Sequence, residues 1–240
     1  MISAVVFDFD GVLIDSEPLH FAAYQEVVSS FGIELTPEDY CEHYLGADDR
    51  GVFRKLAKAR GWELDDSQID SLVEEKTRAF DAVLERNDVL YPAARSCIER
   101  LATEFPLGIA SGAFRHEIEM ILRRSGIERW FRFIVAAGET ARSKPWPDPY
   151  ARAAQLHRAA PSECVAIEDS RAGIASAKAA GLRCVGITTT YPASELGAAD
   201  HVIESLEEFT PELIRKLDTD LQSLRAVRSP SAGPDARSGG

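Results

Sequence analysis

The stretch AVVFDFDGVLIDSEPLH, from Ala4 to His20, opens with a run of four apolar residues that is too short for a helix. Such a run is typical of a strand that is buried on both faces of a sheet. Two aspartates, Asp8 and Asp10, follow the run directly, and Gly11 comes next. Carboxylates are costly to bury, and two of them close together repel each other. The pattern therefore predicts a buried strand whose end presents two carboxylates to a cation.

Short apolar runs of the same kind recur along the chain and alternate with helical patterns. The further strands are predicted at residues 107–110, 133–136, 165–167, 184–187 and 201–203. The helices between them are predicted at residues 93–104, 115–125, 151–160 and 171–180. Strands that alternate with helices form a parallel sheet covered on both faces. The predicted fold class is therefore α/β, with a Rossmann-like core.

One long segment, from about residue 15 to residue 87, has helical periodicity and no strand pattern. A helical block inserted after the first strand is typical of a cap or lid. The end of the chain is rich in Ser, Gly and Pro, which favours disorder. The predicted domains are a catalytic core at residues 1–15 and 88–225, a helical cap at residues 16–87 and a disordered tail at residues 226–240.

The composition restricts the possible partners. With 240 residues, 45% of them hydrophobic, the chain can form one domain with an insertion. Its net charge of -12 argues against a nucleic-acid surface, which needs clustered Lys and Arg. The four cysteines lie far apart, which favours buried thiols in a reducing cytoplasm over zinc or disulfides. Without an apolar run of transmembrane length or a signal-like N-terminus, we expect a cytoplasmic protein with no membrane partner, and a monomer is favoured.

Polar residues follow the later strands as they follow the first. Ser111 and Gly112 come after the second strand, Lys144 lies in the loop after the third, and Glu168 and Asp169 come after the fourth. The carboxyl ends of parallel strands share one edge of a sheet, which is where open α/β folds bind ligands. Oxygen ligands without histidine or thiolate suit Mg²⁺. The sequence therefore predicts a magnesium site at this edge.

Each of these residues also has a purely structural interpretation. Asp8 and Asp10 fit a turn or a helix N-cap, and the segment 168–170 fits the N-cap of the helix that follows it. A lysine in a loop is usually only solvated, and a Ser-Gly pair is common in turns. Four polar clusters that converge on one sheet edge favour the chemical interpretation.

Four motifs stand in order at these strand ends: DFDGV at residues 8–12, ASG at 110–112, SKPWPD at 143–148 and IEDSRAG at 167–173. With them the chain resembles the haloacid dehalogenase superfamily of phosphatases and mutases, from Ile2 to about Phe209. The position of the helical block is similar to that of the branch with a small helical cap. That branch includes enzymes like phosphoglycolate phosphatase, sugar-phosphate phosphatases and β-phosphoglucomutase.

The resemblance implies roles for the four acidic residues. Asp8 would attack phosphorus and form an aspartyl phosphate, which splits one difficult displacement into two. Asp10 would protonate the leaving oxygen and later take a proton from water. Glu168 and Asp169 would bind Mg²⁺ together with Asp8 and the backbone carbonyl of Asp10. Dehalogenases of the family lack an aspartate at the Asp10 position and need no magnesium, so Asp10 argues against dehalogenation.

The resemblance also implies how the phosphoryl group is held. Lys144 would neutralise the nucleophile and the phosphoryl oxygens, as a metaphosphate-like transition state requires. The Ser111 hydroxyl and the Gly112 amide would bind phosphate oxygens.

Four residues of the cap lie at positions that resemble the substrate contacts of β-phosphoglucomutase-like enzymes: His20, Gly46, Arg50 and Lys76. We predict that they determine substrate specificity. For His20 and Lys76, the polar face of an amphipathic helix is an equally good interpretation.

The chain also departs from the mutase pattern. Leu45 stands where that pattern has a basic residue before the glycine, and the mutase arginine comes one residue earlier than Arg50. Ala113 and Arg115 replace a serine and an asparagine of the mutases. A mutase must hold a bisphosphate at both ends, and Arg50 is the obvious candidate for the second phosphate.

The sequence therefore predicts a Mg²⁺-dependent phosphatase that acts through an aspartyl phosphate. A cap that closes over the site favours a small phosphorylated metabolite, of the sugar-phosphate or phosphoglycolate type. The alternative is a β-phosphoglucomutase-like transferase, which a dependence on glucose 1,6-bisphosphate would distinguish. A non-catalytic phosphate-binding protein on the same fold ranks last because Asp8, Asp10 and Lys144 are all present.

Overall fold

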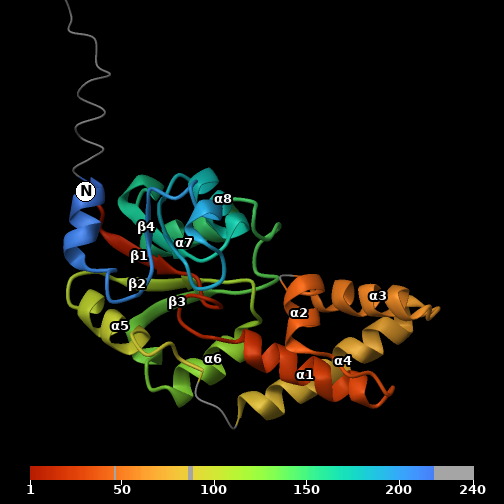
Figure 1. Cartoon of the computed structure of the whole chain (residues 1–240). Helices are drawn as coiled ribbons and strands as arrows, with labels where there is room; N and C mark the ends of the chain where they lie inside the picture. Colours follow the sequence, from red (N-terminus) through yellow and green to blue (C-terminus); the bar gives the residue numbers. More distant parts are fainter. Residues whose placement is uncertain (46, 86–88, 219–240) are drawn as a thin grey trace, which may run out of the picture.

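The computed structural model describes residues 1–45, 47–85 and 89–218. Gly46, which we predicted as a cap contact, lies outside the described residues. So do the predicted tail at residues 226–240 and the end of the predicted core. Figure 1 shows how the described elements are arranged.

Six parallel strands form one sheet in the order β3-β2-β1-β4-β5-β6. The strands are β1 (Ala4–Phe7), β2 (Leu107–Ala110), β3 (Phe131–Val135), β4 (Cys164–Glu168), β5 (Arg183–Ile187) and β6 (His201–Ile203). β1 pairs with β2 on one side and with β4 on the other, so the first strand of the chain lies in the middle of the sheet. This confirms the predicted α/β fold class.

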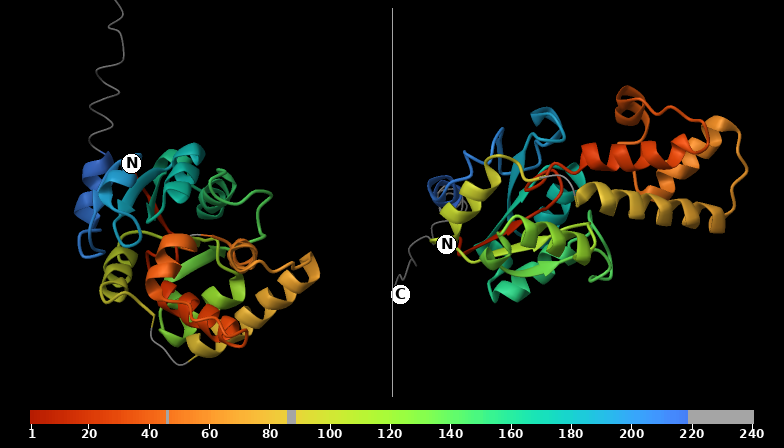
Figure 2. Two further views of the ribbon diagram at one scale, coloured as in Figure 1. Left: turned by 45° about the vertical axis from the view of Figure 1, so that its right-hand side comes forward. Right: turned by 90° about the horizontal axis from the view of Figure 1, so that it is seen from below.

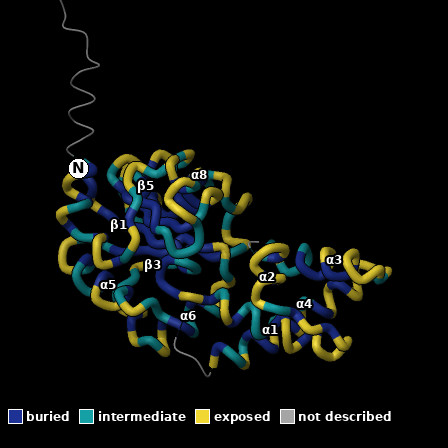
Figure 3. The backbone as a smooth tube through the Cα atoms, viewed as in Figure 1, coloured by how far each residue is buried: buried dark blue, intermediate teal, exposed yellow. Residues whose placement is uncertain are grey.

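Helices cover both faces of this sheet. They are α5 (Ala94–Ala102), α6 (Arg115–Arg124), α7 (Asp148–His157) and α8 (Arg171–Ala180), with short 3₁₀ turns at Glu128–Trp130, Pro161–Glu163 and Ala193–Glu195. Val5 and Phe7 of β1 pack into one core cluster with α5 and α6, while Ala4 and Val6 pack into a second with α7 and α8. Successive side chains of a strand point to opposite faces, so β1 must be apolar at every position. Figure 3 shows the buried backbone concentrated in these strands.

Several predicted boundaries differ from the structure. The third strand begins at Phe131, two residues before the predicted start, because Phe131 already pairs with Leu107 of β2. Helix α7 begins at Asp148 instead of residue 151, because Pro149 fits the first turn of a helix. It ends at His157 instead of residue 160, because Arg158 adopts a left-handed conformation with φ of 58°.

The segment after β1 is helical, as predicted, and packs beside the carboxyl ends of the strands (Figures 1 and 2). It contains α1 (Glu17–Ser29), α2 (Pro37–His43), α3 (Asp49–Arg60) and α4 (Asp66–Leu84), which we call the cap. These helices bury a core cluster of their own around Tyr24, Tyr40 and Phe53. The cap therefore has a core cluster of its own, and Leu19, Phe80 and Leu84 of α1 and α4 also pack into the core cluster of the sheet.

Capping residues set where the two later cap helices begin. The Asp48 side chain accepts a hydrogen bond from the Gly51 amide, so α3 begins at Asp49. Asp65 and Gln68 form a reciprocal capping box at the start of α4. Gly61 ends α3 with φ of 69°, a conformation that glycine adopts without strain. The Asp48 cap makes Asp49 the first residue of α3.

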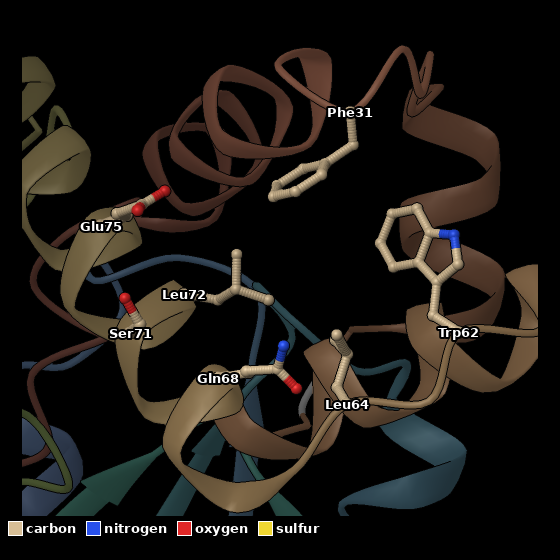
Figure 4. Close-up of a pocket in the computed structure, with 7 residues that line it drawn as sticks. All are labelled: Phe31, Trp62, Leu64, Gln68, Ser71, Leu72 and Glu75. Atoms are coloured by element: carbon tan, nitrogen blue, oxygen red, sulfur yellow. The ribbon is translucent and has the colours of Figure 1, made fainter.

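A pocket of about 370 Å³ opens in the cap where the α3–α4 connection meets the end of α1 (Figure 4). Phe31 and Trp62 border it with their rings 5.4 Å apart, and Gln68 and Glu75 of α4 add polar groups. Phe31 lies beyond the end of α1 and is 50% exposed. None of the predicted site residues that the structure describes lines this pocket.

The described residues agree in part with the expectations from composition. All four cysteines are free, and three of them are buried, but Cys41 on α2 is exposed and not buried as expected. No described helix combines the length and the apolar character that a membrane span needs.

Candidate active site

The first motif brings Asp8 to the end of β1 as a buried residue. The Asp8 amide still donates to the carbonyl of Ile167 on β4, at 3.0 Å, so the side chain emerges beside the end of that strand. Gly11 then turns the chain with φ of 72°. A Cβ atom at Gly11 would lie 2.0 Å from Asp169 Oδ2. The glycine of the motif is therefore needed both for the turn and for the close approach of Asp169.

Glu168 is fully buried and accepts hydrogen bonds from three side chains. Its Oε1 atom accepts from Lys144 Nζ at 2.6 Å and from the Tyr150 hydroxyl at 2.7 Å, and Oε2 accepts from the Ser170 hydroxyl at 3.1 Å. Ser170 also caps α8 by accepting from the Gly173 amide at 3.0 Å. Ser170 therefore fills the N-cap role in this segment, and the metal-site prediction concerns Glu168 and Asp169.

Lys144 lies between two carboxylates, with Nζ 2.7 Å from Asp8 Oδ1 and 2.6 Å from Glu168 Oε1. Burial lowers the pKa of Lys144, but Asp8 and Glu168 together outweigh burial, so its pKa lies above the ordinary value. Lys144 is therefore a charged lysine held at the tip of β1, and the solvated-loop interpretation is wrong.

Three carboxylates gather around this single lysine. Asp8, Glu168 and Asp169 each offer an oxygen within 4.8 Å of the others. Burial, and then the charge of Glu168, raises the pKa of Asp8, and the same two causes raise the pKa of Asp169 to about 7. Such a set of close, buried oxygen donors with excess negative charge fits a divalent cation such as Mg²⁺.

Asp10 lies apart from this oxygen cluster. Its Oδ1 atom accepts a hydrogen bond from the Ser16 hydroxyl at 2.6 Å, and burial raises the pKa of its carboxyl. The positive charges of Lys144 and Lys76 both oppose that rise. The Asp10 carboxylate is not among the clustered oxygens, and its backbone carbonyl stays the predicted metal ligand.

Ser111 and Gly112 follow β2 at the same sheet edge. Ile109 of β2 pairs with Phe7 of β1, so the residues after each strand lie next to each other. Ser111 is buried, and its oxygen accepts from the Ala113 amide at 3.0 Å, which leaves the hydroxyl proton to be donated. Nothing lies within 4 Å of the position that a Gly112 side chain would take, so a ligand can approach its backbone.

The structure brings two of the predicted cap residues together and separates the third. Lys76 Nζ lies 2.8 Å from His20 Nδ1, and Lys76 is only 3% exposed, so it does not belong to a solvated helix face. Arg50 instead bonds to Asp66 and Asp70 at the start of α4.

Sequence reasoning missed several polar partners in this region. Asp49 accepts from Lys76 at 2.9 Å and from the Tyr24 hydroxyl at 2.5 Å. Tyr150 holds Glu168, and Ser16 holds Asp10. The only signal available for Tyr150 was its place two residues after the SKPWPD motif. Nothing in the sequence pairs Asp49 with a lysine 27 positions later.

The environment of His20 leads to a pH prediction. Burial, with the charge of Lys76 adding to it, lowers the pKa of His20 to about 3, and the ring stacks on Phe80 with 4.3 Å between centroids. We expect NMR titration to show a neutral His20 imidazole from pH 7.5 down to pH 4.5. In the urea-unfolded protein the same imidazole should titrate near its ordinary pKa of about 6.5.

The sign of the effect on stability follows from this difference. Below about pH 6.5 the unfolded chain takes up a proton at His20 that the folded chain does not. The contribution of the neutral His20 to the free energy of unfolding is therefore complete above that pH. Below it, this contribution falls by at most about 1.4 kcal/mol per pH unit. A midpoint between pH 5.5 and 7 in the folded protein would contradict the buried, neutral imidazole.

Comparison with known proteins identifies the family of this chain. The family model for haloacid dehalogenase-like hydrolases matches residues 5–187. A phosphorylated carbohydrates phosphatase of Thermotoga maritima is 33% identical over 183 residues, which is 75% of this chain and 82% of that protein. The β-phosphoglucomutase of Bacillus subtilis is 29% identical over 218 residues, which is 89% of this chain and 94% of that protein.

A solved structure shares both the fold and part of the sequence. It is a variant of CbbY from Rhodobacter sphaeroides in complex with xylulose-(1,5)bisphosphate, with 27% identity and a TM-score of 0.74. The match covers 87% of this chain and 96% of that chain. By its sequence, its fold and the residues at its strand ends, this chain belongs to the haloacid dehalogenase-like hydrolase family.

Proposed function

We propose that this protein is a Mg²⁺-dependent phosphomonoesterase that moves the phosphoryl group of a small phosphorylated metabolite first to Asp8 and then to water. The observation that carries the proposal is the Lys144 ammonium between Asp8 and Glu168 at the end of β1, with Asp169 beside them. A phosphoryl group placed against Asp8 would face a carboxylate nucleophile and a fixed positive charge at once.

In the first step an Asp8 oxygen forms a bond to phosphorus while the bond from phosphorus to the leaving oxygen breaks. Lys144 is bonded to Asp8 Oδ1, so it orients the carboxylate and offsets charge on the phosphoryl oxygens. The leaving oxygen takes a proton from Asp10. The raised pKa of Asp10, caused first by burial, favours the protonated form that this step requires.

In the second step water attacks the phosphorus of the aspartyl phosphate. Asp10, now ionised, accepts a proton from that water, and the bond between Asp8 and phosphorus breaks to release phosphate. The Ser16 hydroxyl bonds to Asp10 Oδ1 and holds the carboxyl in one orientation through both proton transfers. Ser111 and the Gly112 amide would bind phosphoryl oxygens at the neighbouring strand end.

Asp8, Glu168 and Asp169, with the Asp10 carbonyl, would hold Mg²⁺. Both oxygens of Glu168 already accept hydrogen bonds, so Glu168 also acts by keeping Lys144 in place. When bound, the ion would supply positive charge beside the phosphoryl oxygens.

We expect phosphate release from a panel of sugar phosphates and phosphoglycolate to require Mg²⁺. Treatment with EDTA should reduce the rate at least about 100-fold, and added Mg²⁺ should restore it, because the buried carboxylates repel an anionic substrate without a cation. A colorimetric phosphate assay measures this. Equal rates with EDTA would overturn the metal requirement, and no release from any ester would overturn the phosphatase.

A mutase is the second candidate, and it is supported by the likeness to a β-phosphoglucomutase. It would return the phosphoryl group to sugar instead of water, so its rate would depend on glucose 1,6-bisphosphate. The position of Arg50 argues against it, because that guanidinium is bonded to Asp66 and Asp70. A cytoplasmic location and a monomeric state stay predictions from the composition.

A further inference from the structure

We propose that Asp49 determines specificity by excluding a second phosphate from the cap side of the site. The substrate would then be a monophosphate whose remaining part is neutral and rich in hydroxyl groups, or positively charged. This inference rests on the proposed function and narrows its substrate class. The hydrogen bonds and the exposure of Lys76 and Asp49 in the cap support it.

The first observation is that the hydrogen bonds of Lys76 are already used. Its Nζ atom bonds to His20 Nδ1 at 2.8 Å and to both oxygens of Asp49 at 2.9 and 3.2 Å. An ammonium group has three donors, so none is left for a ligand. The Tyr24 and Phe80 rings lie 5.0 and 5.1 Å from Nζ and close off the remaining approaches.

The second observation is that Asp49 is held where it is. The Tyr24 hydroxyl donates to Asp49 Oδ1 at 2.5 Å, and Tyr24 itself is buried in the cap core. Asp49 is the first residue of α3, where the helix N-terminus favours a negative charge. Its side chain is 31% exposed while that of Lys76 is 4% exposed. A ligand that reaches this pair therefore meets the carboxylate and not the ammonium.

The third observation concerns net charge. His20 accepts a hydrogen bond from Lys76 and is neutral, so the group formed by His20, Lys76 and Asp49 carries no net charge. Arg50, the next cation along the chain, faces the acidic start of α4. Lys144, at the end of β1, is bonded to Asp8 and Glu168 and would serve the reacting phosphoryl group.

A second phosphate would bring almost two further negative charges next to Asp49. It would find no free donor on Lys76, and it would be repelled by the exposed carboxylate. A hydroxyl group or an ammonium of the substrate could instead donate a hydrogen bond to the exposed Asp49 oxygen. The geometry of the cap therefore selects against bisphosphates.

The test compares fructose 1-phosphate with fructose 1,6-bisphosphate in the Mg²⁺-loaded protein. In both substrates the phosphate on C1 is the group to be released. We expect the wild-type kcat/KM for its release to be at least tenfold higher with fructose 1-phosphate than with fructose 1,6-bisphosphate. In Asp49→Asn this preference should shrink at least tenfold, because the repulsion is gone and Lys76 gains an unbalanced charge. Asp49→Glu keeps the charge and should keep the preference.

Two further measurements separate specificity from folding and from turnover. Glu74→Gln removes an exposed acid from α4 and should leave the preference unchanged. Calorimetry with Asp8→Asn and with Asp8→Asn/Asp49→Asn reports the binding of both ligands without any reaction. If the double variant binds the bisphosphate more tightly than Asp8→Asn does, the inference is supported. If the wild-type protein nevertheless hydrolyses no ester, the proposed function fails and the inference about Asp49 does not.

The inference is overturned if wild-type protein prefers the bisphosphate, or if Asp49→Asn lowers kcat/KM for both substrates by the same factor. The second outcome would assign Asp49 a structural role only. A loss of the melting transition in Asp49→Asn would leave Asp49→Ser as the variant to compare, since serine keeps a polar group beside Tyr24 without the charge.

Discussion

Asp8→Asn is expected to reduce phosphate release by roughly 10⁴-fold or more. Asparagine has nearly the same shape as aspartate, but its amide cannot act as the nucleophile that forms the acyl phosphate. Lys144 keeps its hydrogen bond to Glu168, and the net negative charge of the cluster falls by one, so the fold should be retained. Single-turnover assays with a sugar monophosphate measure the rate, and thermal melting in Mg²⁺ measures the fold.

Asp10→Asn is the matched comparison for this variant. It should also slow the reaction, by about 10²- to 10⁴-fold, because the leaving oxygen loses its acid. The two variants differ in the intermediate that accumulates. Asp8→Asn forms no aspartyl phosphate. Asp10→Asn can still form one from an ester with a good leaving group, such as p-nitrophenyl phosphate. Release by Asp8→Asn at more than a tenth of the wild-type rate would contradict Asp8 as the nucleophile.

The central part of the site could be predicted from the sequence because sheet topology brings it together. Asp8, Lys144 and Glu168 each follow a different strand, and a parallel sheet places those strand ends at one edge. A run of apolar residues is enough to identify each strand. No knowledge of side-chain packing was needed to predict that these charges meet.

The cap could not be predicted in the same way, because its contacts join helices that the sequence does not order in space. Arg50 was expected to face the substrate, but the acids at the start of α4 bind it. Asp49 lies one position earlier and faces Lys76 instead. On a helix, neighbouring residues point about 100° apart, so an uncertainty of one position exchanges the Arg50 cation for the Asp49 carboxylate.

The largest expected effect on stability concerns a residue with no chemistry of its own, Gly173 in the IEDSRAG motif. A Cβ atom at Gly173 would lie 1.9 Å from the carboxylate carbon and both oxygens of Glu168. Gly173 has no positive φ, so alanine there is excluded by this contact and not by backbone strain. Glu168 is fully buried and bonds to Lys144 and Tyr150, so it cannot move without breaking a buried ion pair.

We therefore expect Gly173→Ala to lower the free energy of unfolding by about 3–5 kcal/mol, the usual cost of breaking a buried pair. Phosphate release should fall at the same time, because Lys144 loses the partner that orients it toward Asp8. Gly197→Ala is the control, since nothing lies within 4 Å of the position that its side chain would take, and it should change stability by less than about 1 kcal/mol. Urea denaturation separates the two variants. If Gly173→Ala unfolds like wild type and keeps its activity, Glu168 can occupy another position, and its contacts to Lys144 and Tyr150 are not what aligns the nucleophile.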